Sequence, residues 1–176
     1  YKETNLIAMT KEEILELSKK VCKNTLMETL EIEFTEVGDD YLIAKMPVTS
    51  RVHQPDGVLH GGASVALAES VGSMASYVFL DTEKFYIRGI EISANHLKSI
   101  TEGFVFARAS FIHKGRTTQL FEIRITDEDQ NHYTTISAGY IVDQLVGNHL
   151  ITYGFEYETT NIYNLYMPES INGQWD

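Results

Sequence analysis

A single carboxylate, Glu69, lies in a long run of small and apolar residues that opens with Gly61 and Gly62. None of the residues three or four positions from Glu69 is a cation, so an ion pair within one helix is excluded. Burial of an unpaired carboxylate is costly and raises its pKa, which suits a general base or a nucleophile. Glu69 is therefore a candidate catalytic residue, and membership of a structural ion pair is the alternative.

The two glycines lie where a helix would begin. The first N–H groups of a helix lack partners within it and the helix dipole is positive there, so unobstructed amides could stabilise an oxyanion. Close packing is the alternative role of the glycines. Gly61 and Glu69 would be about 12 Å apart along one helix, too far to act on one carbonyl. We therefore predict that Gly61 of one subunit meets Glu69 of another across the two-fold axis of a homodimer.

Three polar residues could complete such a site. Ser73 follows Glu69 by one turn on the same face and could hydrogen-bond the substrate or the carboxylate. Gln54 and His60 precede the glycines in a loop and could orient a carbonyl group or a water molecule. Each of the three could instead be an ordinary packing or loop residue.

Other chemistries fit this stretch less well. His53 and His60 have no third ligand at a suitable spacing, so no metal site is expected. Ser64 lies in GGASVA, which approaches a nucleophile elbow, but Ala66 stands where that motif needs glycine. The sequence also contains no phosphate-binding loop of the nucleotide-binding kind.

Basic residues gather in two short segments, NHLKS at 95–99 and HKGR at 113–116, with Arg88 on the strand before the first. Strand ends and a tight turn could bring them to one rim of the molecule, where they would bind phosphate groups. Ordinary solvated turns are the alternative. The formal net charge of −11 argues against a nucleic-acid-binding protein, because neutralising a phosphate backbone needs a basic face.

The pattern of apolar residues indicates the elements that must position these groups. A capping box of Thr10 and Glu13 begins an amphipathic helix at about 11–23. Alternating runs on either side of residues 38–40 predict a hairpin. A helix over 63–79, apolar or small on almost all faces, is expected to be buried nearly all round. Four further strands are predicted at about 85–97, 103–113, 117–126 and 132–142.

Short connections make these strands antiparallel neighbours. The predicted fold class is α+β, with a curved antiparallel sheet of about six strands wrapped around one long buried helix. Pairing of two copies would protect the free edges of such a sheet, which again favours a homodimer.

The predicted domain spans residues 10–143. Residues 1–9 are assigned as an N-terminal appendage, and Met9 could be the natural start, in which case residues 1–8 would be the added segment. Residues 144–176 contain no Lys or Arg and are assigned as a C-terminal extension of unknown role. They could form an extra strand, a tail that covers a partner or a poorly ordered end.

The composition also bears on the compartment. The one cysteine, Cys22, cannot form an internal disulfide, and the N-terminal residues lack the apolar stretch of a signal peptide. The most apolar run, 58–80, is interrupted by His60, Glu69, glycines and serines, so no membrane span is expected. A cytoplasmic protein is predicted.

The sequence GVLHGGASVALAES at 57–70, with Gln54 before it and ANHLKS at 94–99 after it, closely resembles the hotdog-fold acyl-CoA thioesterases. It looks like the branch that includes the Arthrobacter-type 4-hydroxybenzoyl-CoA thioesterase and the 1,4-dihydroxy-2-naphthoyl-CoA thioesterase of menaquinone biosynthesis. The resemblance spans about residues 10–142 and does not cover the C-terminal extension.

The resemblance implies a role for each candidate residue. Glu69 would be the catalytic carboxylate, as nucleophile or as base for water, and the Gly61 amide would stabilise the oxyanion. Gln54 and His60 would position the thioester, and Ser73 would assist from the Glu69 side. Coenzyme A would be held by Arg88 and by two segments, Asn95, His96, Leu97 and Lys98, and Lys114, Gly115, Arg116 and Thr117.

The predicted function is hydrolysis of an aromatic acyl-CoA, such as 1,4-dihydroxy-2-naphthoyl-CoA or 4-hydroxybenzoyl-CoA, to the free acid and CoA. Glutamate rather than aspartate at position 69 favours this branch. We expect neither a cofactor nor a metal, and we expect dimers that pair into tetramers. The alternatives are a broad-specificity thioesterase for aliphatic or phenylacetyl-CoA esters, a hydratase or dehydratase, and a non-catalytic acyl-CoA-binding module. A hydratase would need a second acid–base group beside Glu69.

Overall fold

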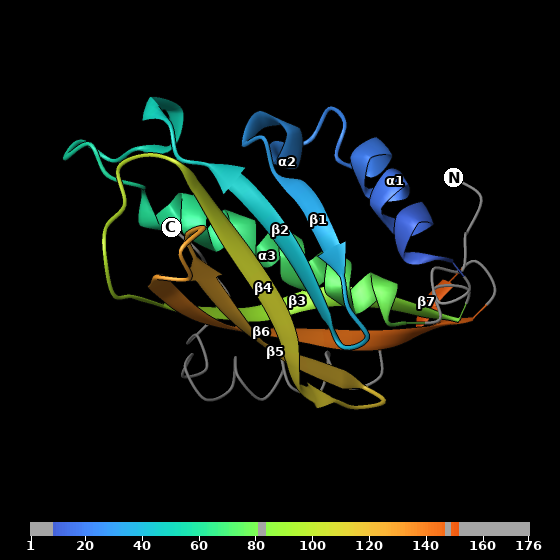
Figure 1. Ribbon diagram of the computed structural model, residues 1–176. Coiled ribbons are helices and arrows are strands. Elements are labelled where there is room, and N and C mark those ends of the chain that lie inside the picture. Colours follow the sequence, from blue (N-terminus) through green and yellow to red (C-terminus); the bar gives the residue numbers. More distant parts are fainter. Residues whose placement is uncertain (1–8, 81–83, 147–148, 152–176) are drawn as a thin grey trace, which may run out of the picture.

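The computed structural model describes residues 9–80, 84–146 and 149–151, and in them a curved sheet wraps one side of a long helix (Figure 1). This is the predicted α+β architecture. The elements in chain order are α1 (Lys11–Val21), α2 (Leu26–Thr29), β1 (Glu33–Val37), β2 (Tyr41–Pro47), a 3-10 turn (Ser50–Val52), α3 (Gly61–Val78), β3 (Phe85–His96), β4 (Phe104–Lys114), β5 (Thr118–Thr126), β6 (His132–Val146) and β7 (His149–Ile151).

Helix α1 begins at the predicted capping box. The Thr10 hydroxyl accepts a hydrogen bond from the Glu13 N–H (3.2 Å), and the Glu13 carboxylate accepts one from the Thr10 N–H (2.8 Å). A second short helix, α2, was not predicted; Thr25 caps it by accepting a hydrogen bond from the Met27 N–H. Both helices lie beside β1 (Figure 1).

The six predicted strands form one antiparallel sheet in the order β1, β2, β4, β5, β6, β3, and the short β7 pairs with β6. The twelve residues of β3 pair with β6, with a bulge between Gly89 and Glu91. Within the described residues no strand lies on the other side of β3. The sheet therefore has a long free edge, which is the feature from which pairing of two copies was predicted.

The core lies between α3 and the inner face of the sheet. Twelve inward-facing residues of the neighbouring strands β2, β4, β5 and β6 are at most 1% exposed: Leu42, Ala44, Met46, Val105, Ala107, Ala109, Phe121, Ile123, Ile125, Ile136, Ala138 and Tyr140. Helix α3 contributes Leu67, Ala68, Val71 and Ala75, all fully buried. The alanines on both sides let the helix approach the sheet closely. Truncation of Leu67 to Ala would therefore leave a cavity and cost about 2–5 kcal/mol of stability.

The prediction that α3 is buried nearly all round is wrong for a single chain. Residues outside the fully buried face of the helix, among them Glu69 and Ser73, are only half-buried, and Gly62 is exposed. The physical reason is that the sheet curves around one side of the helix (Figure 1). The helix also begins at Gly61, two residues before the predicted start. The half-exposed face is the one that carries the candidate carboxylate.

The sheet continues past residue 143, where the composition changes, because β6 runs to Val146 and β7 follows it. Residues 1–8, most of the predicted N-terminal appendage, and residues 152–176 of the predicted extension lie outside the described residues. Among the helices that are described, none has the length and apolar character needed to cross a membrane.

Candidate active site

A tight loop delivers the chain to the start of α3. The Gln54 N–H donates a hydrogen bond to the Val58 carbonyl (2.9 Å), and the Gly57 N–H donates one to the Gln54 carbonyl (3.0 Å). Gly57 adopts φ +76°, a conformation that side chains disfavour. The His60 N–H then donates to the Val52 carbonyl (2.8 Å), which fixes the residue that precedes the helix.

His60 is the N-cap of α3, a role that was not predicted. Its ring Nδ1 accepts a hydrogen bond from the Gly62 N–H at 2.8 Å, and its carbonyl accepts from the Ala63 N–H (3.0 Å) and the Ser64 N–H (3.3 Å). Of the first four helical N–H groups, that of Gly61 alone has no hydrogen-bond partner among the described residues. The helix start therefore presents one free donor, at the residue predicted to bind the oxyanion.

His96, at the end of β3, lies against that donor. A Cβ atom on Gly61 would be 2.8 Å from the His96 Nε2, so glycine is needed for the two elements to approach this closely. The other ring nitrogen of His96 is 3.2 Å from the hydroxyl of the buried Thr134. The structure thus brings a residue of the predicted coenzyme A segment to the helix start, a contact that the sequence did not reveal.

Glu69 projects from the half-exposed side of α3 toward β3. Its carboxylate oxygen Oε1 occupies the space beside Gly89, where a Cβ atom would be only 2.9 Å away. Burial raises the pKa of Glu69, and the hydroxyl of Tyr140 lowers it in part. Among the described residues Glu69 forms no ion pair. The carboxylate therefore lacks a neutralising cation, as the sequence predicted for the helix itself.

Helix α3 separates the two halves of the candidate site. Gly61 is its first residue and Glu69 lies eight positions further on, about 12 Å along the axis. His60 and Gln54 lie at the Gly61 end, whereas Ser73, half-buried, lies one turn beyond Glu69. One chain therefore does not bring its own Gly61, His60 and Gln54 to its own Glu69.

Comparison with known proteins identifies the family. The model of the thioesterase superfamily matches residues 56–133. The chain is 45% identical over 114 residues to the 1,4-dihydroxy-2-naphthoyl-CoA hydrolase of Escherichia coli, covering 65% of this chain and 83% of that protein. The identity to the proofreading thioesterase EntH of Cronobacter turicensis is 47% over 114 residues, covering 65% of this chain and 82% of that protein. This chain belongs to the thioesterase superfamily.

The solved structures agree with this assignment. The crystal structure of a mutant thioesterase from Pseudomonas aeruginosa matches with a TM-score of 0.75 and 44% identity, covering 80% of this chain and 99% of that one. The predicted hotdog fold and the predicted resemblance are both confirmed, and the protein is a thioester hydrolase. Every candidate residue except Gln54 lies inside the region, residues 56–133, that the family model matches.

The basic segments of this thioesterase do not share one rim within a chain, so that prediction is wrong for the single subunit. In the β3–β6 ladder Arg88 pairs with Ile141 and His96 with Thr134, so they are about 26 Å apart along β3. The 114–117 turn lies at the Arg88 end, because Thr118 of β5 also pairs with Ile141. Segment 95–98 lies at the opposite end. Both β3 and β5 pair with β6, so the end of the sheet at which each basic segment lies depends on the strand order. The periodicity of the sequence does not reveal that order.

Two of the basic side chains are already engaged. The Arg88 guanidinium donates two hydrogen bonds, from Nε (3.1 Å) and Nη2 (2.6 Å), to one oxygen of the buried Asp143. The Lys114 ammonium lies over the rings of Phe79 and Phe111, 5.5 and 5.2 Å from their centroids. Arg88 is therefore held within its own chain, whereas Lys114 lies exposed at the start of the turn.

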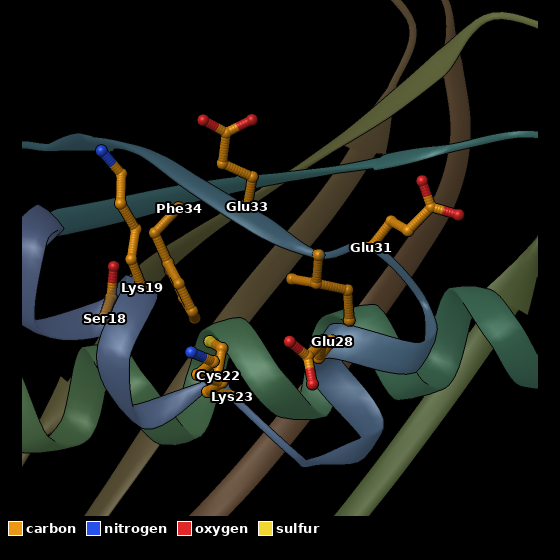
Figure 2. A pocket seen from close by; sticks show the side chains of 9 residues that line it. Ser18, Lys19, Cys22, Lys23, Glu28, Glu31, Glu33 and Phe34 are labelled. Atoms are coloured by element: carbon orange, nitrogen blue, oxygen red, sulfur yellow. The ribbon is translucent and has the colours of Figure 1, made fainter.

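A groove of about 310 Å³ lies at the other edge of the sheet, where α1 and α2 meet β1 (Figure 2). Lysine and glutamate side chains, among them Lys19, Lys23, Glu28 and Glu31, surround it. None of the candidate residues lines this groove. In the described part of the chain, no three His, Cys, Asp or Glu side chains gather in a way that could hold a metal ion.

Proposed function

We propose that this thioesterase hydrolyses an aromatic acyl-CoA to the free acid and CoA, with Glu69 as the catalytic carboxylate and the Gly61 N–H as the oxyanion donor. The observation that carries the proposal is that α3 combines a half-buried carboxylate, which has the Tyr140 hydroxyl near it but no cation among the described residues, with a first-turn N–H that has no acceptor among those residues. The raised pKa of Glu69 makes it a stronger base than an exposed carboxylate. The name of the Escherichia coli relative, a 1,4-dihydroxy-2-naphthoyl-CoA hydrolase, supports an aromatic acyl group.

One carboxylate can perform this hydrolysis in two ways. As a nucleophile, Glu69 would attack the carbonyl carbon, the C–S bond would break with release of the CoA thiolate, and water would hydrolyse the resulting anhydride. As a general base, Glu69 would take a proton from water while that water attacks the same carbon, and would pass the proton to the departing thiolate. In both routes the carbonyl oxygen becomes an oxyanion that the Gly61 N–H would stabilise.

The loop before α3 would orient the thioester. Because the Nδ1 of His60 accepts from the Gly62 N–H, the proton of the neutral ring is on Nε2, which can donate to a carbonyl oxygen. The side-chain amide of Gln54 could donate beside it, and Ser73 would contact the substrate from the Glu69 side. This chemistry needs neither a metal nor a redox cofactor.

We propose further that each site is shared by two subunits. The two halves lie about 12 Å apart on α3, the Glu69 face of the helix is half-exposed, and the free β3 edge exposes Tyr86 and Ile90. Antiparallel pairing of two β3 strands would also bring the 95–98 end of one chain to the 114–117 end of the other. Lys98, Lys114 and Arg116 could then bind the phosphates of CoA together, and pairing of dimers into tetramers would leave these sites intact.

A thiol-release assay tests the activity. We expect the protein to turn over 1,4-dihydroxy-2-naphthoyl-CoA and 4-hydroxybenzoyl-CoA faster than hexanoyl-CoA and phenylacetyl-CoA. Glu69→Gln should lower kcat by on the order of 10³-fold or more, whereas Glu91→Gln, on the exposed side of β3, should not. Full activity of Glu69→Gln would refute the mechanism, a preference for hexanoyl-CoA would refute the aromatic assignment, and binding without turnover would indicate a binding module.

Mixing two inactive variants tests the shared site. Glu69→Gln and Gly61→Val subunits should each form inactive dimers, but a mixed dimer would contain one intact site, with Gly61 from the first subunit and Glu69 from the second. Random exchange makes half of the dimers mixed, so roughly a quarter of wild-type activity should return. If each site lay within one chain, mixing would restore none.

A further inference from the structure

Tyr140 of β6 is the largest fully buried side chain of the described residues, and its hydroxyl points at the helix that carries Glu69. The hydroxyl donates a hydrogen bond to the Glu69 carbonyl oxygen at 3.3 Å. A buried tyrosine hydroxyl needs a partner, and here that partner is the candidate catalytic residue itself. The bond joins the main chain of α3 to β6, the strand next to the edge strand β3.

Two glycines make room for this arrangement. A Cβ atom on Gly72, one turn after Glu69, would be 2.5 Å from the Tyr140 hydroxyl oxygen. A Cβ atom on Gly89, the residue that pairs with Tyr140 across β3 and β6, would be 2.9 Å from the Glu69 Oε1. The hydroxyl and the carboxylate therefore each occupy a space that an ordinary side chain would fill.

The surroundings of Glu69 leave Tyr140 as its main polar neighbour. The inward residues of β2 and β4 are apolar, and those of β5 are apolar apart from the neutral Gln119. On β3, Arg88 and Glu91 lie near Gly89, but Arg88 binds Asp143 and Glu91 is exposed. Burial raises the pKa of Glu69, and the Tyr140 hydroxyl lowers it in part. Burial and the nearby Glu69 raise the pKa of Tyr140, so the tyrosine stays neutral and can donate a hydrogen bond.

We propose that Tyr140 is a positioning residue for Glu69, holding this turn of α3 and its carboxylate in place against Gly89. The inference rests on the proposed catalytic role of Glu69, although the contact itself can be tested without activity. Tyr140 is fully buried between α3 and the sheet, so we expect it to act through Glu69 and not through contact with the substrate. Its loss should therefore lower kcat and leave KM nearly unchanged.

Tyr140→Phe is the first test, because it removes the hydroxyl and keeps the ring. We expect a roughly two- to tenfold fall in kcat and an acid limb of the kcat/KM profile that moves to higher pH, because the Tyr140 hydroxyl, which lowers the pKa of Glu69, is removed. Tyr133→Phe is the matched control: it removes a hydroxyl bonded to Asp127 near the start of the same strand. This control should keep the wild-type kcat and pH profile.

A direct titration separates this inference from the proposed function. The ¹³C signal of the Glu69 carboxyl, assigned by its loss in Glu69→Gln, should titrate at higher pH in Tyr140→Phe than in the wild type. Gly72→Ala, which displaces the hydroxyl but keeps it in the protein, should shift the titration in the same direction. An unchanged Glu69 titration in both variants would overturn the inference, whether or not Glu69→Gln is inactive. A shifted titration with an active Glu69→Gln would retain the contact and reject the catalytic role.

Discussion

Gly89 offers a sharp test of how the carboxylate is placed. Substitution by alanine adds one methyl group on the inner side of β3, at 2.9 Å from the Glu69 Oε1 and 3.7 Å from the nearest ring carbon of Tyr140. The backbone itself accepts alanine, because Gly89 is not among the residues with positive φ. The substitution therefore acts on the carboxylate and little else.

The expected size of the effect follows from that contact. To regain an ordinary separation of about 3.4 Å from the new methyl group, the carboxylate must move by about 0.5 Å. A displacement of 1 Å in an active site can lower the rate by a factor of about 100. We therefore expect a roughly tenfold fall in kcat. Stability should change in the other direction. Alanine in a strand is favoured over glycine by about 0.5–1 kcal/mol, so the variant should unfold at the same or a slightly higher temperature.

The assay pairs steady-state thiol release with thermal unfolding. Gly139→Ala on the neighbouring strand is the control, because its Cβ would meet Ile90 at an ordinary 3.4 Å. We expect the control to keep the wild-type kcat with a similar gain in stability. A Gly89→Ala enzyme with wild-type kcat, or one that loses activity only because it unfolds, would show that the carboxylate does not depend on this space.

Three further predictions concern neighbouring groups. His60→Ala should lose the cap of the Gly62 N–H and destabilise the protein by about 1 kcal/mol in chemical denaturation, and should also lower kcat; unchanged stability would contradict the capping role. Burial raises the folded-state pKa of Glu69 above its ordinary value of 4.5, so the folded protein favours the neutral carboxyl group. The contribution of this group to the stability of the fold is fully present below pH 4.5 and is lost as the pH rises through the folded-state pKa. Glu69→Gln should thus melt at a higher temperature than the wild type at pH 8, the gain should vanish near pH 4, and a gain independent of pH would argue against a buried charge. Arg88→Leu should destabilise the protein because Asp143 stays buried without its partner, and the double variant with Asp143→Leu should recover stability, as a double-mutant cycle would show.

Local patterns predicted the elements well because short-range physics determines them. The capping box of Thr10 and Glu13 forms as expected, and the alternation of Phe121, Ile123 and Ile125 places these three residues in the core. The lone carboxylate and the glycine-opened helix were visible for the same reason. Each depends on residue types a few positions apart.

The wrong predictions concern features that depend on contacts between residues far apart in the sequence. Composition could not show that the sheet covers only one side of α3, so the Glu69 face was expected to be buried. Nor could it show that β3 and β5 flank β6, which puts segment 95–98 and turn 114–117 at opposite ends of the sheet. The His60 cap had a local signal, because it directly precedes two glycines at a helix start, but histidine is an uncommon cap.

The glycines around α3 show how this sequence specifies the site. Gly61, Gly72 and Gly89 are absent from the positions with positive φ, so conformational freedom does not explain them. Each stands where an added Cβ would collide with a polar group: His96 at Gly61, the Tyr140 hydroxyl at Gly72 and the Glu69 carboxylate at Gly89. The polar groups of the site are thus held in spaces that missing side chains leave open. It follows that alanine at any of the three positions should impair function more than folding, which is opposite to the usual effect of filling space in a core.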